Sequence, residues 1–277
     1  MKNKLSENIL KIITIGAAII TISVLLFIII FILSKGIPYL KPSLFSLDYN
    51  SENVSLLPAL ITTVAVTVLS LIIAAPVSIF AAIWLCEYAK RGNKLVKLVR
   101  ITAETLSGIP SIVYGLFGML FFVSFLGWGY SLLAGAFTLS VMILPLILRA
   151  TEEALTAVPD SWREGSFGLG AGKLRTVMRI ILPAAAPGIF SGIILAVGRI
   201  VGESAALIYT AGSVAQIPEN VFDSARTLSV HMYALSSEGL HVGEGYATAV
   251  ILLIVVVLIT MSASAAIAKK VGRGGNV

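Results

Sequence analysis

Long apolar runs without charge constrain this chain more than any other feature of its sequence. The first run, residues 12–33, contains 22 residues and no charged side chain. A helix of about 20 apolar residues is long enough to cross the ~30 Å hydrocarbon core of a bilayer. Comparable runs occupy residues 58–85, 108–126, 130–148, 187–211 and 246–268. We therefore predict an all-α integral membrane protein with six transmembrane helices.

Composition supports this fold class and argues against a signal peptide at the start. Only 12% of the residues are charged, whereas soluble domains carry roughly 25%. The first apolar run follows Lys2, Lys4 and Lys11, but it exceeds the 7–15 residues of a signal sequence and no small-residue cleavage site follows it. We expect this run to be retained as the first transmembrane helix.

The placement of basic residues predicts the orientation in the membrane. Sixteen of the 20 Lys and Arg residues lie in the N-terminal tail, the second and fourth connections and the C-terminal tail. Basic residues concentrate on the cytoplasmic side of membrane proteins. Both termini are therefore predicted to be cytoplasmic, as an even number of spans requires. The residues are Lys2, Lys4, Lys11, Lys90, Arg91, Lys94, Lys97, Arg100, Arg149, Arg163, Lys173, Arg175, Arg179, Lys269, Lys270 and Arg273.

The fourth connection is long, basic and interrupted by glycines. Pro159 and Pro183 bracket two segments with helical spacing, about 160–167 and 173–181. Asp160 or Ser161 could cap the first helix by accepting a backbone N–H bond, and Gly170 could provide the left-handed turn that ends it. This pattern predicts a rigid helical protrusion on the cytoplasmic face. On physical grounds alone, an amphipathic hairpin resting on lipid headgroups is an alternative.

The segment EGSFGLGAGKLRTVMRIILP, residues 164–183, also carries a motif. Glu164, Gly165, Ser166, Gly170, Ile180, Leu182 and Pro183 follow the spacing E-A-A-x3-G-x9-I-x-L-P, with the two alanines replaced by small residues. The segment thus resembles the EAA loop of bacterial binding-protein-dependent ABC importer permeases. The resemblance implies a type I ABC importer permease fold, with this loop docking on an ATP-hydrolysing subunit.

The same resemblance implies how the chain is divided. Residues 1–57 would form the N-terminal tail, first helix and external loop; residues 58–268 the permease domain, with its coupling loop at 150–186; and residues 269–277 a cytoplasmic tail. The chain contains no G-x4-G-K-[ST] phosphate-binding loop. We therefore expect a transport subunit rather than an enzyme, with no cofactor of its own and with ATP and Mg on a partner ATPase.

Three further stretches narrow the resemblance to one group within the family. GIPSIVYGLFG at 108–118, LPLILRATEEALTAVP at 144–159 and GRIVGESAALIYTAG at 198–212 resemble the PstA-type subunit of the bacterial phosphate importer, as does LSVHMYALSSEG at 228–239. This implies phosphate import across the cytoplasmic membrane. The implied partners are an ATP-binding subunit dimer, a PstC-type second permease and an extracytoplasmic phosphate-binding protein. Import of another oxyanion, sulfate or molybdate, is the alternative, and no nucleic-acid partner is expected.

Arg199 and Glu203 are the candidate pathway residues. Counted from Pro187, Arg199 is about 18 Å into the fifth predicted span, where a charge is costly and usually faces a protein interior or a water-filled cavity. Glu203 would follow one helical turn later on the same face. The two residues could form a neutral structural pair, or Arg199 could bind an oxyanion while Glu203 keeps that binding weak. No metal site is expected, because His231 and His241 have no neighbours at ligand spacing.

Polar residues elsewhere in the predicted helices have simpler interpretations. Thr62, Thr63, Thr67 and Ser70 recur at helical spacing in the second span and could line a path. Hydroxyls of this kind more often bond to a carbonyl of their own helix. Glu152 and Glu153, at the cytoplasmic end of the fourth span, are expected to be solvated.

Overall fold

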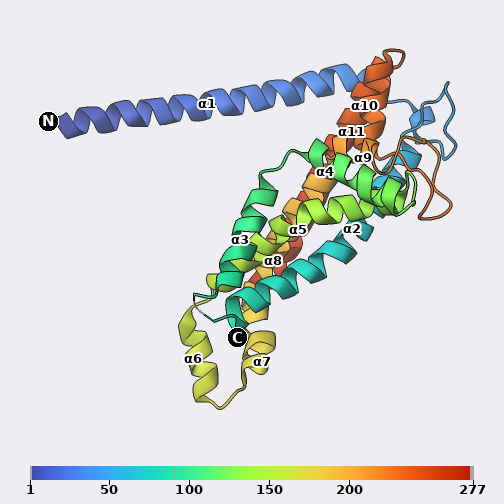
Figure 1. Cartoon of the computed structure of the whole chain (residues 1–277). Helices are drawn as coiled ribbons and strands as arrows, with labels where there is room; N and C mark the ends of the chain where they lie inside the picture. Colours follow the sequence, from blue (N-terminus) through green and yellow to red (C-terminus); the bar gives the residue numbers. More distant parts are fainter. Residues whose placement is uncertain (1, 91, 275–277) are drawn as a thin grey trace.

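The computed structural model describes residues 2–90 and 92–274, with side chains described for residues 7–90, 92–262 and 264–265. Within these residues every regular element is a helix, which confirms the predicted fold class. The basic side chains of Lys2, Lys4, Arg91, Lys269, Lys270 and Arg273, which the topology prediction uses, lie outside the described part. So do residues 275–277 of the tail. Figure 1 shows an elongated bundle from which the first helix projects.

Five helical stretches are long and apolar enough to cross a membrane. They are α1 (Lys2–Gly36), α2 (Leu57–Ile83) with its terminal π-turn η3 (Trp84–Tyr88), α5 (Leu132–Thr156), the continuous run α7 (Lys173–Thr176), η5 (Val177–Ile181) and α8 (Leu182–Val201), and α11 (Val242–Gly274). A sixth span exists if the bent pair of α3 (Lys94–Ser107) with α4 (Ser111–Gly118) and η4 (Met119–Phe125) crosses as one unit.

The bent pair corrects the expected third span at 108–126. Its two arms meet at 102°, and the break falls at Gly108–Pro110. Proline lacks an N–H and disfavours helical geometry in the residue before it, so the chain leaves α3 and begins a new helix at Ser111. The third span is therefore a broken element instead of a single straight helix.

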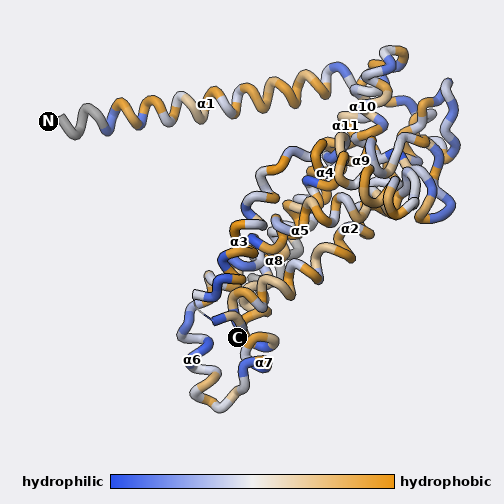
Figure 2. Tube along the Cα trace, viewed as in Figure 1, coloured by the Kyte–Doolittle hydropathy of each residue, from blue (hydrophilic) through white to orange (hydrophobic). Residues whose placement is uncertain are grey.

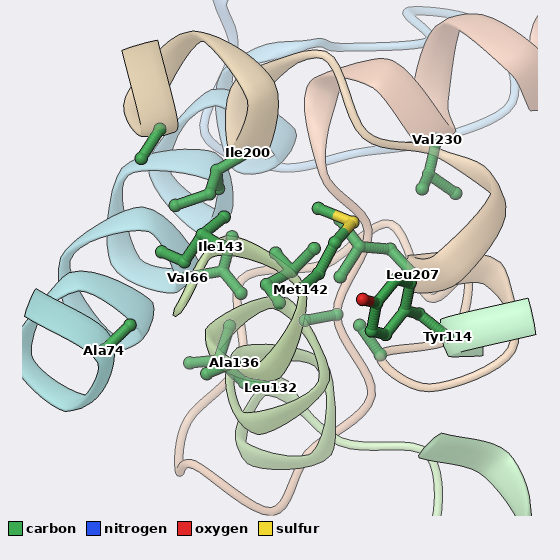
Figure 3. Close-up of a cluster of buried hydrophobic side chains, with 14 of the residues drawn as sticks. Val66, Ala74, Tyr114, Leu132, Ala136, Met142, Ile143, Ile200, Leu207 and Val230 are labelled. Carbon is green, nitrogen blue, oxygen red and sulfur yellow. The ribbon is translucent and has the colours of Figure 1, made fainter. Parts of the chain in front are cut away.

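Helix α5 is the centre of the bundle and packs against α2, α4 and α8. The main buried cluster includes Met142 and Ile143 of α5, together with Val66, Tyr114 and Ile200 from α2, α4 and α8; Figure 3 shows these side chains converging. A Cβ at position 188 of α8 would lie 2.6 Å from the Cβ of Ala154. Glycine there lets two helix backbones approach closely, as membrane helix pairs often do.

The fifth long helix begins and ends earlier than the expected span at 187–211. Pro183 and Pro187 lie inside a helical run that starts at Lys173 and ends at Val201. The π-turn η5 directly precedes Pro183, and local π adjustments of this kind accommodate a proline within a membrane helix. Gly202 then ends α8, and the short helix α9 (Ala205–Ile208) follows after a break.

The opposite end of the bundle from α6 and α7 carries the short elements η1 (Ile37–Tyr39), η2 (Pro42–Phe45), α9 and α10 (Leu228–Glu238). Helix α10 is formed by most of the stretch LSVHMYALSSEG at 228–239. Leu44, Leu56 and Leu235 are fully buried in a cluster that joins these elements to the outer end of α2. The external segments are therefore packed on the bundle.

Among the described side chains of helix α1, those of its apolar stretch lie outside the core. No residue of its most apolar 18-residue window is buried, and Figure 2 shows apolar residues along almost its whole length. It meets α11 near its C-terminal end, where Gly36 packs against Tyr246 and Val250 and the ring of Phe31 lies edge-on to that of Tyr246. A helix that is apolar on every face is suited to a membrane span surrounded by lipid.

Candidate functional site: the cytoplasmic loop and the groove beside Arg199

The loop between α5 and α8 folds as a helical hairpin at one end of the bundle (Figure 1). Helix α6 (Asp160–Gly168) is followed by a turn in which Gly170 has φ +80°, a conformation that glycine adopts without steric cost. Helix α7 then returns to the bundle. The expected first helix and the left-handed turn at Gly170 are confirmed. The expected second helix at 173–181 does not end at Pro183 but continues into α8.

The capping prediction for α6 was wrong. Pro159 occupies the N-cap position, and neither Asp160 nor Ser161 accepts a capping bond. The Asp160 carboxylate instead accepts a hydrogen bond from Arg163 Nη1 at 3.2 Å. Proline holds the backbone in the extended conformation that precedes a helix, so α6 can start here without a side-chain cap.

A buried hydroxyl pair joins the two arms of the hairpin. Ser166 Oγ lies 2.8 Å from Thr176 Oγ1, and both side chains are buried. Position 166 is the second small residue of the E-A-A pattern, and only a small side chain leaves room for α7 at this distance. The hydrogen bond therefore holds α6 against α7. It gives Ser166, which stands where the motif has its second alanine, a structural role.

The remaining motif residues separate into a surface set and an anchoring set. Glu164, Gly165 and Gly170 are exposed at the tip, beside the apolar residue Leu169, whose exposed fraction is 92%. Ile180 and Leu182 pack against a buried cluster formed by the ends of α2 and α5 and the run into α8. The tip thus presents an unpartnered surface with apolar and charged groups, while the base of the loop is fixed to the bundle.

Arg199 lies in the last turn of α8, on the wall of a groove of about 1160 Å³ between α5, α8 and α11. The helix starts at Lys173, so Arg199 is about 39 Å along it at ~1.5 Å per residue. The earlier depth of about 18 Å assumed a start at Pro187 and no longer holds. Gly188, Ser191 and Gly198 also face this groove. Their spacing of three and seven residues places them on one face of the helix.

Among the described side chains, Arg199 and Glu203 do not form an ion pair, which was one of the two interpretations of these residues. Gly202 ends α8, so Glu203 lies beyond the helix and is only 9% exposed. Its carboxylate accepts the Ala206 N–H at 3.0 Å, and its carbonyl accepts a hydrogen bond from the Ser229 hydroxyl. Glu203 therefore organises the start of α9 and its contact with α10.

The other polar candidates are structural. Thr63 and Thr67 bond to carbonyls of their own helix, Ala59 O and Thr63 O, both at 2.7 Å. Ser70 Oγ donates to Ala136 O of α5 at 3.1 Å, and all three are buried, as is Thr62. The interpretation of these hydroxyls as helix-bonding groups is therefore confirmed for Thr63 and Thr67.

The expectation that Glu152 would be solvated was wrong. Its carboxylate oxygen Oε1 accepts a hydrogen bond from Arg100 Nε at 2.6 Å. This ion pair joins α3 to the cytoplasmic end of α5, whereas Glu153 is exposed.

Comparison with known families agrees with this arrangement. The model of the family described as binding-protein-dependent transport system inner membrane component matches residues 74–273. The probable ABC transporter permease protein YqgI of Bacillus subtilis is 38% identical over 62% of this chain and 63% of its own length. The aligned chain thus covers less than two thirds of that relative. The phosphate transport system permease protein PstA of Haemophilus influenzae is 35% identical over 73% of this chain and 72% of its own.

Solved structures show the same fold at lower identity. A chain of the MetNI methionine ABC transporter in an inward-facing conformation superposes with a TM-score of 0.60 at 22% identity. The superposition covers 77% of this chain and 93% of that one. At this level of identity the likeness concerns the architecture of the helices alone.

Proposed function

Because this chain belongs to the family of binding-protein-dependent transport system inner membrane components, we propose that it is a permease subunit of an ATP-driven importer of inorganic phosphate. The assignment of phosphate as the substrate rests on the similarity to a phosphate transport permease along most of the chain. An arginine at the wall of a membrane groove is consistent with an anionic cargo. In this proposal the permease domain spans residues 58–268.

In this proposal the hairpin at 150–186 is the coupling loop that docks on a separate ATPase dimer. The exposed residues Glu164, Gly165 and Gly170 and the apolar Leu169 form the contact surface. Ser166 holds the hairpin closed, and Ile180, Leu182 and Pro183 belong to its base. ATP and Mg are bound by the partner. This chain contributes the conformational change of the membrane helices and binds no cofactor of its own.

Arg199 is the proposed anion contact in the pathway. Its guanidinium has a planar set of donors that matches the oxygens of phosphate in a bidentate manner, and it forms no ion pair with Glu203. A pathway site has to release its cargo, so an arginine that is the only basic residue among the described side chains of the groove is suited to passage. Glu203 acts indirectly, by holding the start of α9 directly after the end of α8.

The remaining partners follow from the same assignment. A second, related PstC-type permease would complete the pathway across the groove, and an extracytoplasmic phosphate-binding protein would deliver the cargo to the end that carries α10. Bilayer lipid surrounds the helices, including the exposed α1. Sulfate or molybdate import would use the same architecture, and oxyanion competition separates these substrates.

Uptake of labelled phosphate by starved cells tests the proposal directly. Deletion of the chain should abolish high-affinity uptake, and excess sulfate or molybdate should leave uptake by the intact chain unchanged. Arg199→Gln should lower uptake about tenfold, which corresponds to ~1.4 kcal/mol, and Arg199→Lys should lower it less. Arg149→Gln, which removes an exposed cytoplasmic arginine, is the control. Uptake that sulfate abolishes would overturn the phosphate assignment.

A further inference from the structure

One arginine beside the motif makes bonds to three separate parts of the chain. Arg163, in the first half of α6, donates to Glu87 Oε1 from Nη2 at 2.7 Å and from Nε at 3.2 Å. Its Nη1 donates to the carbonyl of Val158 at 2.8 Å, and its Nη2 donates to the carbonyl of Leu155 at 2.9 Å. Asp160, described above, is a further acceptor.

These bonds are shielded from water. The Arg163 side chain is 16% exposed and the Glu87 side chain 8%. Charged hydrogen bonds in such surroundings are strong, and removal of one partner leaves the other charge buried and unpaired. The bonds to Glu87 raise the pKa of the Arg163 guanidinium above its ordinary value, so the side chain stays charged. Lysine has no planar fork and cannot serve all of these acceptors together.

The acceptors belong to the ends of two membrane helices. Leu155 lies in the last turn of α5, where carbonyls have no partner within the helix and favour a positive charge. Val158 lies two residues beyond the end of α5, in the joint that leads to α6. Glu87 lies in η3, the π-turn that ends α2, 76 residues away in sequence. Arg163 therefore connects α6 to both α2 and α5.

The bonds of Arg163 bridge the joint between α5 and α6, where the loop would otherwise bend. Helix α5 ends at Thr156 and α6 begins at Asp160, so only three residues, 157–159, join them. A short non-helical joint is where a hinge usually absorbs motion. On the other side of the hairpin, α7 runs into α8 without a break. With the joint bridged, both arms of the hairpin are rigidly attached to membrane helices.

We propose that Arg163, with Glu87 as its partner, is a positioning residue that locks the coupling loop to α2 and α5 and so transmits ATPase movement to the membrane helices. The transmission rests on the proposed function, whereas the lock is a property of this chain alone. Arg163 sits one residue before the motif that contacts the partner, so it acts through the orientation of α6.

The lock can be measured by spin labels in the purified full-length chain. In a Cys86→Ser background, labels at Val68→Cys on the exposed face of α2 and at Leu169→Cys at the loop tip report the spread of their separation in pulsed electron spin resonance. Arg163→Ala should broaden the distance distribution, Arg163→Lys should broaden it less, and Glu87→Gln least. Arg149→Ala, at an exposed pair 4.0 Å from Glu104, should leave it unchanged.

The functional experiment uses the assembled importer, purified with the ATPase that accompanies it and reconstituted in vesicles. Arg163→Ala should reduce phosphate uptake at least tenfold while ATP hydrolysis continues, because the loop would move without the helices. The double variant Glu87→Ala with Arg163→Ala should be no worse than Arg163→Ala alone, since coupled residues are not additive. The milder Arg163→Lys keeps the test available if Arg163→Ala folds poorly.

The spin-label experiment and the uptake experiment together distinguish failure of the inference from failure of the substrate assignment. An unchanged distance distribution in both Arg163 variants would overturn the inference, as would a broadened distribution accompanied by normal coupling of uptake to hydrolysis. If the unaltered importer transports no phosphate while Arg163→Ala still broadens the distribution, the substrate assignment fails and the lock stands.

Discussion

At the scale of single residues, His231 shows how burial decides the state of a titratable side chain. The ring is fully buried in α10, with Nε2 3.3 Å from the Val54 carbonyl and Nδ1 3.5 Å from Nη1 of Arg226. The carbonyl requires a proton on Nε2, and the guanidinium donates to Nδ1, so the neutral ring fits both neighbours. Burial, and then the charge of Arg226, lower the pKa of His231 from 6.5 to about 4.

This lowered pKa predicts a loss of stability in mild acid. The neutral ring contributes its full stability above pH 6.5, and that contribution is lost as the pH falls from 6.5 toward 4, because the unfolded chain takes up the proton first. At pH 5 the loss is about 2 kcal/mol. Melting of the purified chain at pH 7.5 and pH 5 measures it. His231→Gln should flatten the difference and His241→Gln should keep it; an equal difference in His231→Gln would refute the assignment.

At the scale of elements, the packing of α8 on α5 depends on glycines at one face. A Cβ on Gly192 would overlap Ala150 Cβ, whereas a Cβ on Gly198 of the same helix would meet nothing within 4 Å. Overpacking a tight helix contact typically costs about 1–3 kcal/mol, while alanine is a better helix former than glycine by roughly 0.5–1 kcal/mol.

Gly192→Ala and Gly198→Ala therefore form a matched pair with opposite expected effects. Gly192→Ala should lower the melting temperature of the purified chain, because α5 and α8 have to separate to admit the methyl group. Gly198→Ala should leave the melting temperature unchanged or raise it slightly. Equal melting temperatures for the two variants would show that the α5–α8 contact is looser than the structure has it.

At the scale of the whole molecule, the bundle has two chemically different ends. One carries the basic hairpin of α6 and α7, and the other carries the short elements η1, η2, α9 and α10 (Figures 1 and 2). The side with more basic residues is expected to be cytoplasmic. We therefore expect Leu169 to lie on the cytoplasmic side and Leu240, between α10 and α11, on the outer side.

Accessibility of single cysteines tests this orientation. In a Cys86→Ser background, a membrane-impermeant maleimide should label Leu240→Cys in intact spheroplasts, because that side chain is 82% exposed. Leu169→Cys should be labelled only after the membrane is permeabilised. The reverse pattern would contradict the predicted topology and, with it, the docking of the loop on a cytoplasmic ATPase.

Much of the fold could be predicted from local patterns in the sequence. The length of the apolar runs predicted all-helical spans, since a bilayer leaves few other ways to satisfy backbone hydrogen bonds. The glycine at position 170 and the motif spacing predicted the hairpin and its turn, both of which the structure contains. These signals act within a few residues of one another. Element boundaries near Pro110, Pro183 and Pro187 were less certain, because a proline can either break a membrane helix or be accommodated in it.

The relations between distant residues depended on the three-dimensional packing. A pair between Glu203 and Arg199, four residues earlier, was one of two interpretations of these charges. Because α8 ends at Val201, Glu203 instead bonds to residues of α9 and α10. Arg163 and Glu87 are 76 residues apart, and no local pattern joins them. The length of the apolar runs and the motif spacing thus determine much of which helices form. Which charges meet is decided by how those helices pack, because a buried ion pair depends on the positions of several elements together.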